Sequence, residues 1–360
     1  MAYTTIDNPE LYFQANLHSG NGSARSITFG GSENMQPDWV WIKERNAAEH
    51  HYLFDSVRGV QKFIYTNLDH SQPSANANSL TAFDSNGFST GNYADINESS
   101  KTYVSWNWKA GTTGSGTTTG SGTGKAYSYS VNTTAGFSIV QFVGNGTAGH
   151  TIPHQLGAVP KMIIVKSVSF TEDWEVYHHS LGNENVIRLN STGAAFDAAK
   201  WNDTTPTSSV FSVDSSNSVN KNDETFIAYS FCEKQGYSKF GIYTGTDSTS
   251  GPFVYTGFKP AWLMIKRTDS ADTSSNMNGS HWVMLDNKRD TINSAGAANT
   301  LTANRNNAED TTNLTNVNFL SNGFKFRGGA DAVNDSGTYI FMAFAESPFV
   351  NSKGVPNNAR

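Results

Sequence analysis

The sequence predicts an all-β protein built from three tandem antiparallel β-sandwich domains, jelly-roll-like in form, that share one repeat. A strand-like phrase from a proline to a lysine occurs three times, followed each time by an aromatic core phrase and a closing strand that begins with threonine. The apolar runs are short and are bounded by Gly, Asn, Asp or Pro, as is typical of strands. The three proline-to-lysine phrases are residues 37–43, 160–166 and 260–266.

The spacing between these phrases indicates that the repeat is not chance. In the first two copies 18 residues separate the proline from the end of the core phrase, at Asp55 and His178, and 47 more lead to the closing threonine. In the third copy the same two intervals are 26 residues, from Pro260 to Asp286, and 52 residues, from Asp286 to Thr338. Its additional residues are most simply placed in the polar stretch 269–280. Repeats of about 100 residues exceed the usual solenoid unit of about 20 to 50, so each copy is expected to be a small domain.

The closing strands indicate how each copy packs. In residues 225–231, Ile227 and Tyr229 share one face of the strand, while Phe226 and Ala228 share the other. Both faces are largely apolar, which predicts a central strand that contacts the opposite sheet on one side and a neighbouring domain or loop on the other. The strand tryptophans are expected in the core, namely Trp39, Trp41, Trp106 and Trp108.

An N-terminal arm is expected over residues 1–16, before a first sandwich over 17–110. Leu11, Tyr12 and Phe13 are apolar enough to anchor this arm on a partner protein. The arm is therefore the predicted attachment point.

Residues 111–124 contain only Gly, Ser and Thr, and so the linker 111–135 is predicted to begin as a flexible tether. Sandwiches two and three, at 136–236 and 237–350, are separated by few residues and are expected to pack as a rigid pair. A C-terminal tail over 351–360 completes the predicted division.

Composition narrows the classes of partner. Charged residues are only 16% of the chain, the net charge is −6 and no Lys/Arg cluster occurs, so nucleic acid is not expected as a partner. No apolar stretch approaches a membrane span, so no membrane partner is expected either. Cys232 is the only cysteine and no signal peptide is recognised, which fits synthesis in a reducing cytoplasm.

No residue pattern indicates a catalytic residue, a metal site or a cofactor, so an enzyme is not expected. His50–His51 and His178–His179 fall at nearly equivalent places, but neighbours on a strand point to opposite faces, and a structural role is expected. Calcium binding by a loop stays open. The weak candidates for ligand contact are Trp201, in a polar loop where an exposed indole could stack on a sugar ring, and the loop residues Asp269, Asp272 and Asn276.

Phrases along the whole chain carry a resemblance to a known family. They are residues 144–150, 174–182 and 251–260, with 37–43, 53–59 and 83–88 in the first copy. Together they resemble a repeat-containing family of virion proteins of marine bacteriophages, from about Leu11 to Val350. The resemblance implies a phage structural protein, often a tail fibre, and carries over no catalytic residue.

These observations favour a tail fibre or appendage that contacts other virion proteins and binds a host surface glycan or receptor. A head decoration or capsid fibre protein is the alternative, and a polysaccharide depolymerase is a minor one. The protein is expected in the virion after assembly in the host cytoplasm, and a homotrimer, common among phage appendages, stays open.

Overall fold

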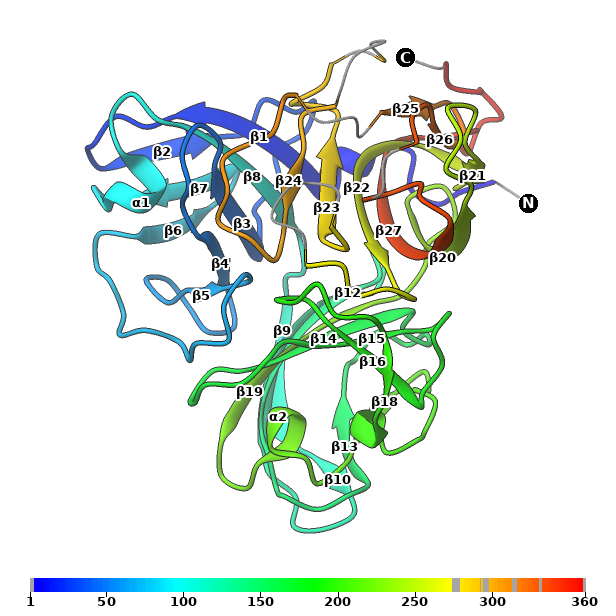
Figure 1. Cartoon of the computed structure of the whole chain (residues 1–360). Coiled ribbons are helices and arrows are strands. Elements are labelled where there is room, and N and C mark those ends of the chain that lie inside the picture. The colour runs from blue at the N-terminus through cyan, green and yellow to red at the C-terminus, as the bar shows by residue number, and fades with distance from the viewer. Residues whose placement is uncertain are drawn as a thin grey trace.

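The computed structural model describes residues 3–273, 279–291, 293, 298–312, 316–329 and 332–358. Within these ranges the strands form six sheets whose pairings are antiparallel, and each helix has only three or four residues. The prediction of an all-β sandwich fold is confirmed. Three two-sheet bodies lie around a common centre, the first in blue and cyan, the second in green and the third from yellow to red (Figure 1).

The first body, called unit 1, has a large sheet in the order β1-β8-β3-β4-β5 and a small sheet in the order β2-β7-β6. The first and last strands of the unit are therefore neighbours, as in jelly-roll-like sandwiches. Its elements are β1 Phe13–Ser19, β2 Arg25–Thr28, β3 Trp39–Glu44, β4 His51–Asp55, β5 Ile64–Tyr65, β6 Leu80–Asp84, β7 Gly87–Thr90, α1 Ala94–Asn97 and β8 Thr102–Trp108, after a 3-10 turn at Pro9–Leu11.

Unit 3 repeats this order strand for strand, with a large sheet β20-β27-β22-β23-β24 and a small sheet β21-β26-β25. The proline-to-lysine phrase lies in the middle of the large sheet in both units, next to the closing strand. The strands are β20 Ser238–Gly245, β21 Phe253–Tyr255, β22 Phe258–Arg267, β23 Trp282–Asp286, β24 Leu301–Thr302, β25 Val317–Leu320, β26 Gly323–Phe326 and β27 Gly337–Pro348.

Unit 2 has the same central order, β12-β19-β14-β15-β16, but its large sheet is extended to eight strands by β17 at one end and by β11 and β9 at the other. Its small sheet is β10-β13-β18. The elements are β9 Thr112–Thr117, β10 Thr119–Gly120, β11 Ala126–Asn132, β12 Phe137–Val143, β13 His150–Pro153, β14 Met162–Ser167, β15 Glu175–His178, β16 Asn185–Arg188, β17 Phe196–Asp197, a 3-10 turn at Ala199–Trp201, β18 Val210–Val213, α2 Asn217–Asn220 and β19 Thr225–Phe231.

The Gly/Ser/Thr segment 111–124 forms β9 and β10, so the prediction of a flexible tether was wrong. A side chain on Gly114 would collide with the ring of Tyr129, and one on Gly116 with the ring of Tyr127. The two glycines therefore leave room for tyrosine rings from β11 to lie across the strand, an arrangement known to stabilise glycine-rich strands. Composition could not reveal this, because both the pairing partner and the rings come from the following strand.

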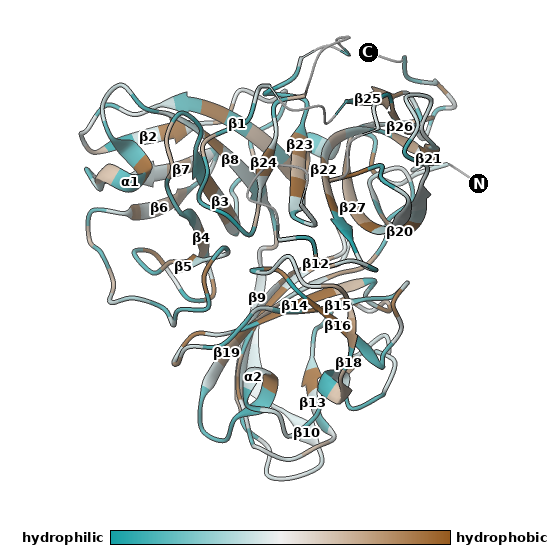
Figure 2. Ribbon diagram, viewed as in Figure 1, coloured by the Kyte–Doolittle hydropathy of each residue, from teal (hydrophilic) through white to brown (hydrophobic). Residues whose placement is uncertain are grey.

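Each unit has its own apolar interior between its two sheets, and a larger cluster lies between the units. This shared cluster takes side chains from the three large sheets, and Figure 2 shows hydrophobic residues along these central strands. The ring of Phe231 lies 5.8 Å from that of Trp39 in unit 1 and 6.0 Å from that of Phe344 in unit 3. The expectation that unit 1 stands apart from a rigid pair was therefore wrong.

The two apolar faces of β19 are used as predicted. Ile227 and Tyr229 belong to the shared cluster, whereas Phe226 and Ala228 belong to the interior of unit 2. A strand with two apolar faces is thus buried between its own small sheet and the neighbouring units, and the four strand tryptophans predicted to be core are buried as well.

Three indole N–H groups join the units in a closed ring. Unit 2 donates to unit 1, unit 3 donates to unit 2, and unit 1 donates to unit 3. The bonds run from Trp174 to the Tyr65 carbonyl at 3.0 Å, from Trp282 to the Arg188 carbonyl at 2.8 Å, and from Trp106 to the Asp286 carboxylate at 2.9 Å.

The N-terminal arm is part of this core. Phe13, which begins β1, is 2% exposed and packs 4.8 Å from the ring of Trp108. Tyr12 lies edge-on to Tyr237 of the segment before unit 3, at 6.0 Å. Leu11 ends the 3-10 turn before them. Phe13 is therefore used inside the chain and is not free to anchor it to another protein, which corrects the expected role.

Candidate ligand-binding groove

Trp201 lies in the interior of unit 2. It is 1% exposed, its ring is 5.8 Å from that of Tyr177, and its indole N–H donates to the Asn185 carbonyl at 3.2 Å. The expectation of an exposed indole was wrong, because the polar residues around it form a short turn that folds the ring inward. Trp201 cannot stack on an external sugar.

The other candidates from the sequence lie at one end of unit 3. The Asp269 carboxylate is 2.9 Å from Arg267 Nε and accepts the N–H of Thr338 at 3.0 Å, so it holds the start of β27. Asp272 and Ser280 exchange hydrogen bonds at the base of a loop. Asn276 lies outside the described residues. Asp269 and Asp272 thus lie in unit 3, whereas Trp201 lies in the interior of unit 2.

An open groove of about 290 Å³ lies elsewhere, where the N-terminal segment meets the connection between units 2 and 3. One wall is Tyr3, another is the 233–239 connection, and the third is the end of β21 with its turn. Thr4 fixes the N-terminal wall, because its hydroxyl donates to the Gln235 carbonyl at 2.8 Å. The groove thus depends on three segments that are distant in sequence.

Gly236 makes the close approach of two of these segments feasible. Its φ of +77° is a conformation that other residues rarely adopt, and a Cβ there would lie 2.9 Å from the Thr4 side chain. Glycine at this position therefore lets the N-terminal segment lie directly on the connection.

Two tyrosines form the aromatic part of the groove. The Tyr3 and Tyr255 hydroxyls are 3.2 Å apart, and Tyr3 donates to the Gly257 carbonyl at 2.8 Å. Burial raises the pKa of Tyr3, and its hydrogen bond with Tyr255 acts in the same direction. Tyr255 is 53% exposed, so much of its side chain is accessible to a ligand, while its hydroxyl is hydrogen-bonded to that of Tyr3.

A charged pair supplies the polar part. Lys239 Nζ lies 2.7 Å from Glu233 Oε1, and the two side chains are 35% and 29% exposed. Such a partly exposed pair contributes little to stability. The carboxylate has a second oxygen to accept hydrogen bonds, and the ammonium has further donors. The pair therefore offers both kinds of hydrogen bond beside an exposed aromatic ring.

None of these groove residues was singled out from the sequence. Alternation within β21 does place Phe253 and Tyr255 on one face, and both are exposed in the structure. This signal of paired exposed aromatic residues was available. The contribution of Tyr3 and of the 233–239 connection was not, because it depends on how the units pack.

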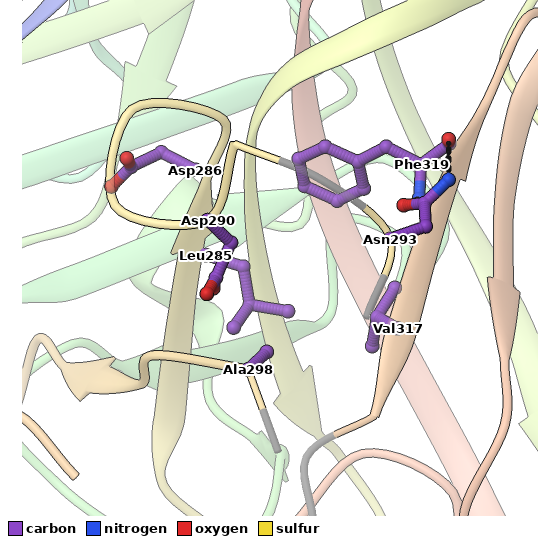
Figure 3. A pocket seen from close by; sticks show the side chains of 7 residues that line it. All are labelled: Leu285, Asp286, Asp290, Asn293, Ala298, Val317 and Phe319. Atoms are coloured by element: carbon purple, nitrogen blue, oxygen red, sulfur yellow. Dashed lines mark hydrogen bonds between the residues drawn. The ribbon is translucent and has the colours of Figure 1, made fainter. Parts of the chain in front are cut away.

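A second, much smaller pocket lies in unit 3, with a volume of about 20 Å³ (Figure 3). That is about the space of one water molecule. Asn293 closes it by donating from Nδ2 to the Phe319 carbonyl at 2.8 Å. Asp286 and Asp290 lie at its edge, and burial raises the pKa of Asp290. The Asp286 carboxylate already accepts hydrogen bonds from Arg289 and Trp106. The pocket is therefore too small for a sugar, and one of its two carboxylates is already used by the fold.

In the part of the chain that the structure describes, no group of three or more His, Cys, Asp or Glu residues is placed to hold a metal ion. No helix among the described residues is long and apolar enough to cross a membrane.

Fold and groove together define an all-β protein of three joined sandwiches with an open, polar and aromatic groove at the edge of the third. Residues 8–348 match the family described as a domain of unknown function (DUF7483), and the chain belongs to this family. The match runs through all three units. No curated protein and no solved structure matches the chain.

Proposed function

We propose that this protein is a structural component of a bacteriophage virion, a tail fibre or appendage that binds a glycan on the host surface. The observation that carries the proposal is the groove in which the exposed ring of Tyr255 lies beside the Glu233–Lys239 pair. The phage context rests on the resemblance of the repeated phrases.

The chemistry of the groove suits a sugar. A pyranose ring has an apolar face of C–H groups that can pack on a tyrosine ring, and its hydroxyls both donate and accept. Glu233 accepts such bonds and Lys239 donates them. A groove of about 290 Å³ is near the lower end of the usual range for small-ligand sites, which suits a terminal unit of a larger glycan.

The test is adsorption of the purified chain to host cells and competition with infection. Saturable adsorption that a soluble surface glycan displaces is the expected result. Absence of adsorption, together with no competition, would remove the binding role. Measuring polysaccharide length after long incubation tests the depolymerase alternative, for which we expect no shortening.

A head decoration or capsid fibre protein is the second candidate. The closed ring of three similar units favours it, because such a body presents three similar sides to a position of threefold symmetry on a capsid. A low-resolution map of the assembled virion separates the two proposals. Density on the capsid rather than on the tail would support the role of a head decoration or capsid fibre protein and would contradict that of a tail fibre.

A further inference from the structure

The outer edge of β9 is an open end of the eight-stranded sheet. Among the strands of the described residues, β9 is the last in the sheet order and pairs with β11 only. Five of its six residues are exposed and the sixth, Gly114, is half-buried. Natural edge strands are usually protected by lysine, proline, a bulge or a covering segment. Residues 111–124 contain no charged residue and no proline, so none of the sequence devices is present.

The free backbone groups along this edge belong to alternate residues. The N–H of Thr118 donates to the Lys125 carbonyl at 2.8 Å, directly after the paired part of the two strands. In an antiparallel ladder successive residues direct their N–H and C=O to opposite sides. The groups of Thr113, Ser115 and Thr117 therefore point away from β11, toward the open edge.

The sequence of this edge is self-complementary. Residues 113–117 read Thr-Gly-Ser-Gly-Thr in both directions, with Ser115 at the centre. If two such strands run antiparallel, Ser115 faces its own copy and each Thr113 faces a Thr117. Threonine pairs across antiparallel strands are favourable, and no like charges meet.

We propose that β9 is a self-association edge, and that a second copy of this chain pairs with it antiparallel about a twofold axis at Ser115. The outward-pointing backbone N–H and C=O groups of Thr113, Ser115 and Thr117 in each copy then form hydrogen bonds with those of the other copy. The two eight-stranded sheets thereby join into one continuous sheet. The interface is isologous, which closes at two copies.

A shallow groove of about 340 Å³ adjoins this edge. Ser115, Ser128 and Gln141 line it on one face of the sheet. The twofold axis brings the two copies of this groove together across the junction, so each copy adds contacts beyond the strand pair itself. The total area is still small compared with the ~1,000 Å² of stable interfaces, so the dimer is expected to depend on protein concentration. It would be favoured on a virion, where local concentration is high.

Cysteine cross-linking tests both the edge and the register. In the proposed pair the two Ser115 Cα atoms are about 5.5 Å apart, which lies within the disulfide range. S115C at high protein concentration, with oxidised glutathione as the oxidant, should give a disulfide-linked dimer. Cys232 is buried and leaves no competing exposed thiol in the native chain.

T117C is the matched control. In the proposed register its two copies lie about 14 Å apart, so T117C alone should cross-link at least tenfold less than S115C. A mixture of T113C and T117C chains should again form a linked dimer. An S115K variant, at an exposed position, should keep the melting temperature and lose the concentration-dependent dimer in sedimentation equilibrium.

Three results would overturn the proposal. One is a native chain that stays monomeric at the highest reachable concentration while folded S115C gives no dimer. Another is cross-linking of T117C as efficient as that of S115C. The third is protection of the β9 amides by a different virion protein while the chain itself remains monomeric.

Discussion

The hydroxyl of Tyr229 in unit 2 donates a 2.7 Å hydrogen bond to the Asp55 carboxylate in unit 1. Arg58 Nε lies 2.5 Å from the same carboxylate, and all three side chains are buried. Burial raises the pKa of Tyr229 well above its usual value, and the Asp55 charge acts in the same direction, so its proton stays in place. A buried ion pair of unit 1 is thus completed by a residue of unit 2.

We expect Tyr229→Phe to lower the free energy of unfolding by about 1.5 to 3 kcal/mol, because one hydrogen bond to a charged group is lost. Asp55→Ala should cost more, about 3 to 5 kcal/mol, because it leaves the Arg58 guanidinium buried without a counter-charge. Urea unfolding measures both. Tyr255→Phe removes a hydroxyl whose hydrogen bond to Tyr3 lies at the exposed surface, and it serves as the control, with a change within about 0.5 kcal/mol. Equal effects of the three changes would contradict this ranking.

An asparagine before each closing strand holds the neighbouring loops together. In unit 2 Asn220 Nδ2 donates to the Asp214 carbonyl at 2.8 Å, and Asn220 Oδ1 accepts from a backbone N–H at 2.9 Å. Asn97 and Asn334 make equivalent bonds in units 1 and 3. All three residues are buried.

Asn220→Ala should therefore lower stability by about 3 kcal/mol, since it leaves buried backbone groups without partners. The exposed Asn222→Ala is the neighbouring control and should change stability by less than about 0.5 kcal/mol. Thermal or urea unfolding of the two variants gives the comparison. A loss confined to Asn222→Ala would refute the assignment.

Three buried lysines end the proline-to-lysine phrases, and we expect them to make the stability of the protein depend on pH. Burial lowers the pKa of Lys43 and Lys166 to about 8 and that of Lys266 to about 7. Their ammonium groups donate to backbone carbonyls, as Lys266 does to Ser280 at 2.8 Å. Because the folded pKa values lie below the unfolded value of 10.5, the unfolded chain binds more protons in this window.

Stability is therefore expected to rise as pH increases from about 7 toward 10, by up to ~1.4 kcal/mol per pH unit for each lysine. Urea midpoints at about pH 7 and pH 9 measure this rise. Lys266→Met removes the group with the lowest folded pKa and should reduce the rise between pH 7 and pH 9 by nearly half. A slope that is flat in the native chain, or unchanged in Lys266→Met, would show that the ammonium groups are not penalised in the fold.

The proposed glycan-binding groove can be tested by mutation, with a matched control residue on the same face of β21. Tyr255→Ala should weaken glycan binding about tenfold, because the stacked ring is worth about 1 to 2 kcal/mol. Phe253→Ala removes a similarly exposed ring outside the groove, 44% exposed against 53% for Tyr255, and should leave affinity unchanged. Glu233→Gln should weaken binding while keeping the shape of the groove. Titration of the displacing glycan against the folded variants measures all three, and equal losses from Tyr255→Ala and Phe253→Ala would rule out a local site.

The sequence predicted the sandwich fold and the central place of the closing strand, because spacing and alternation are local properties. It did not predict that β9 is a strand, since its stability comes from the rings of Tyr127 and Tyr129 on the next strand. Trp201 was misplaced because the polarity of its neighbours says nothing about where the indole points. The groove was not foreseen, because Tyr3 and Tyr255 are adjacent only after the units have packed.

The ring of indole hydrogen bonds has a consequence for how the chain can vary. Every unit donates to one neighbour and accepts from the other, so the set closes at three. A fourth unit would meet no indole donor or acceptor of this ring that is not already used. Deletion of any unit would leave one indole and one acceptor without their partners in the ring. Within this chain the ring of hydrogen bonds therefore closes at three units, and a change in the number of units would break it.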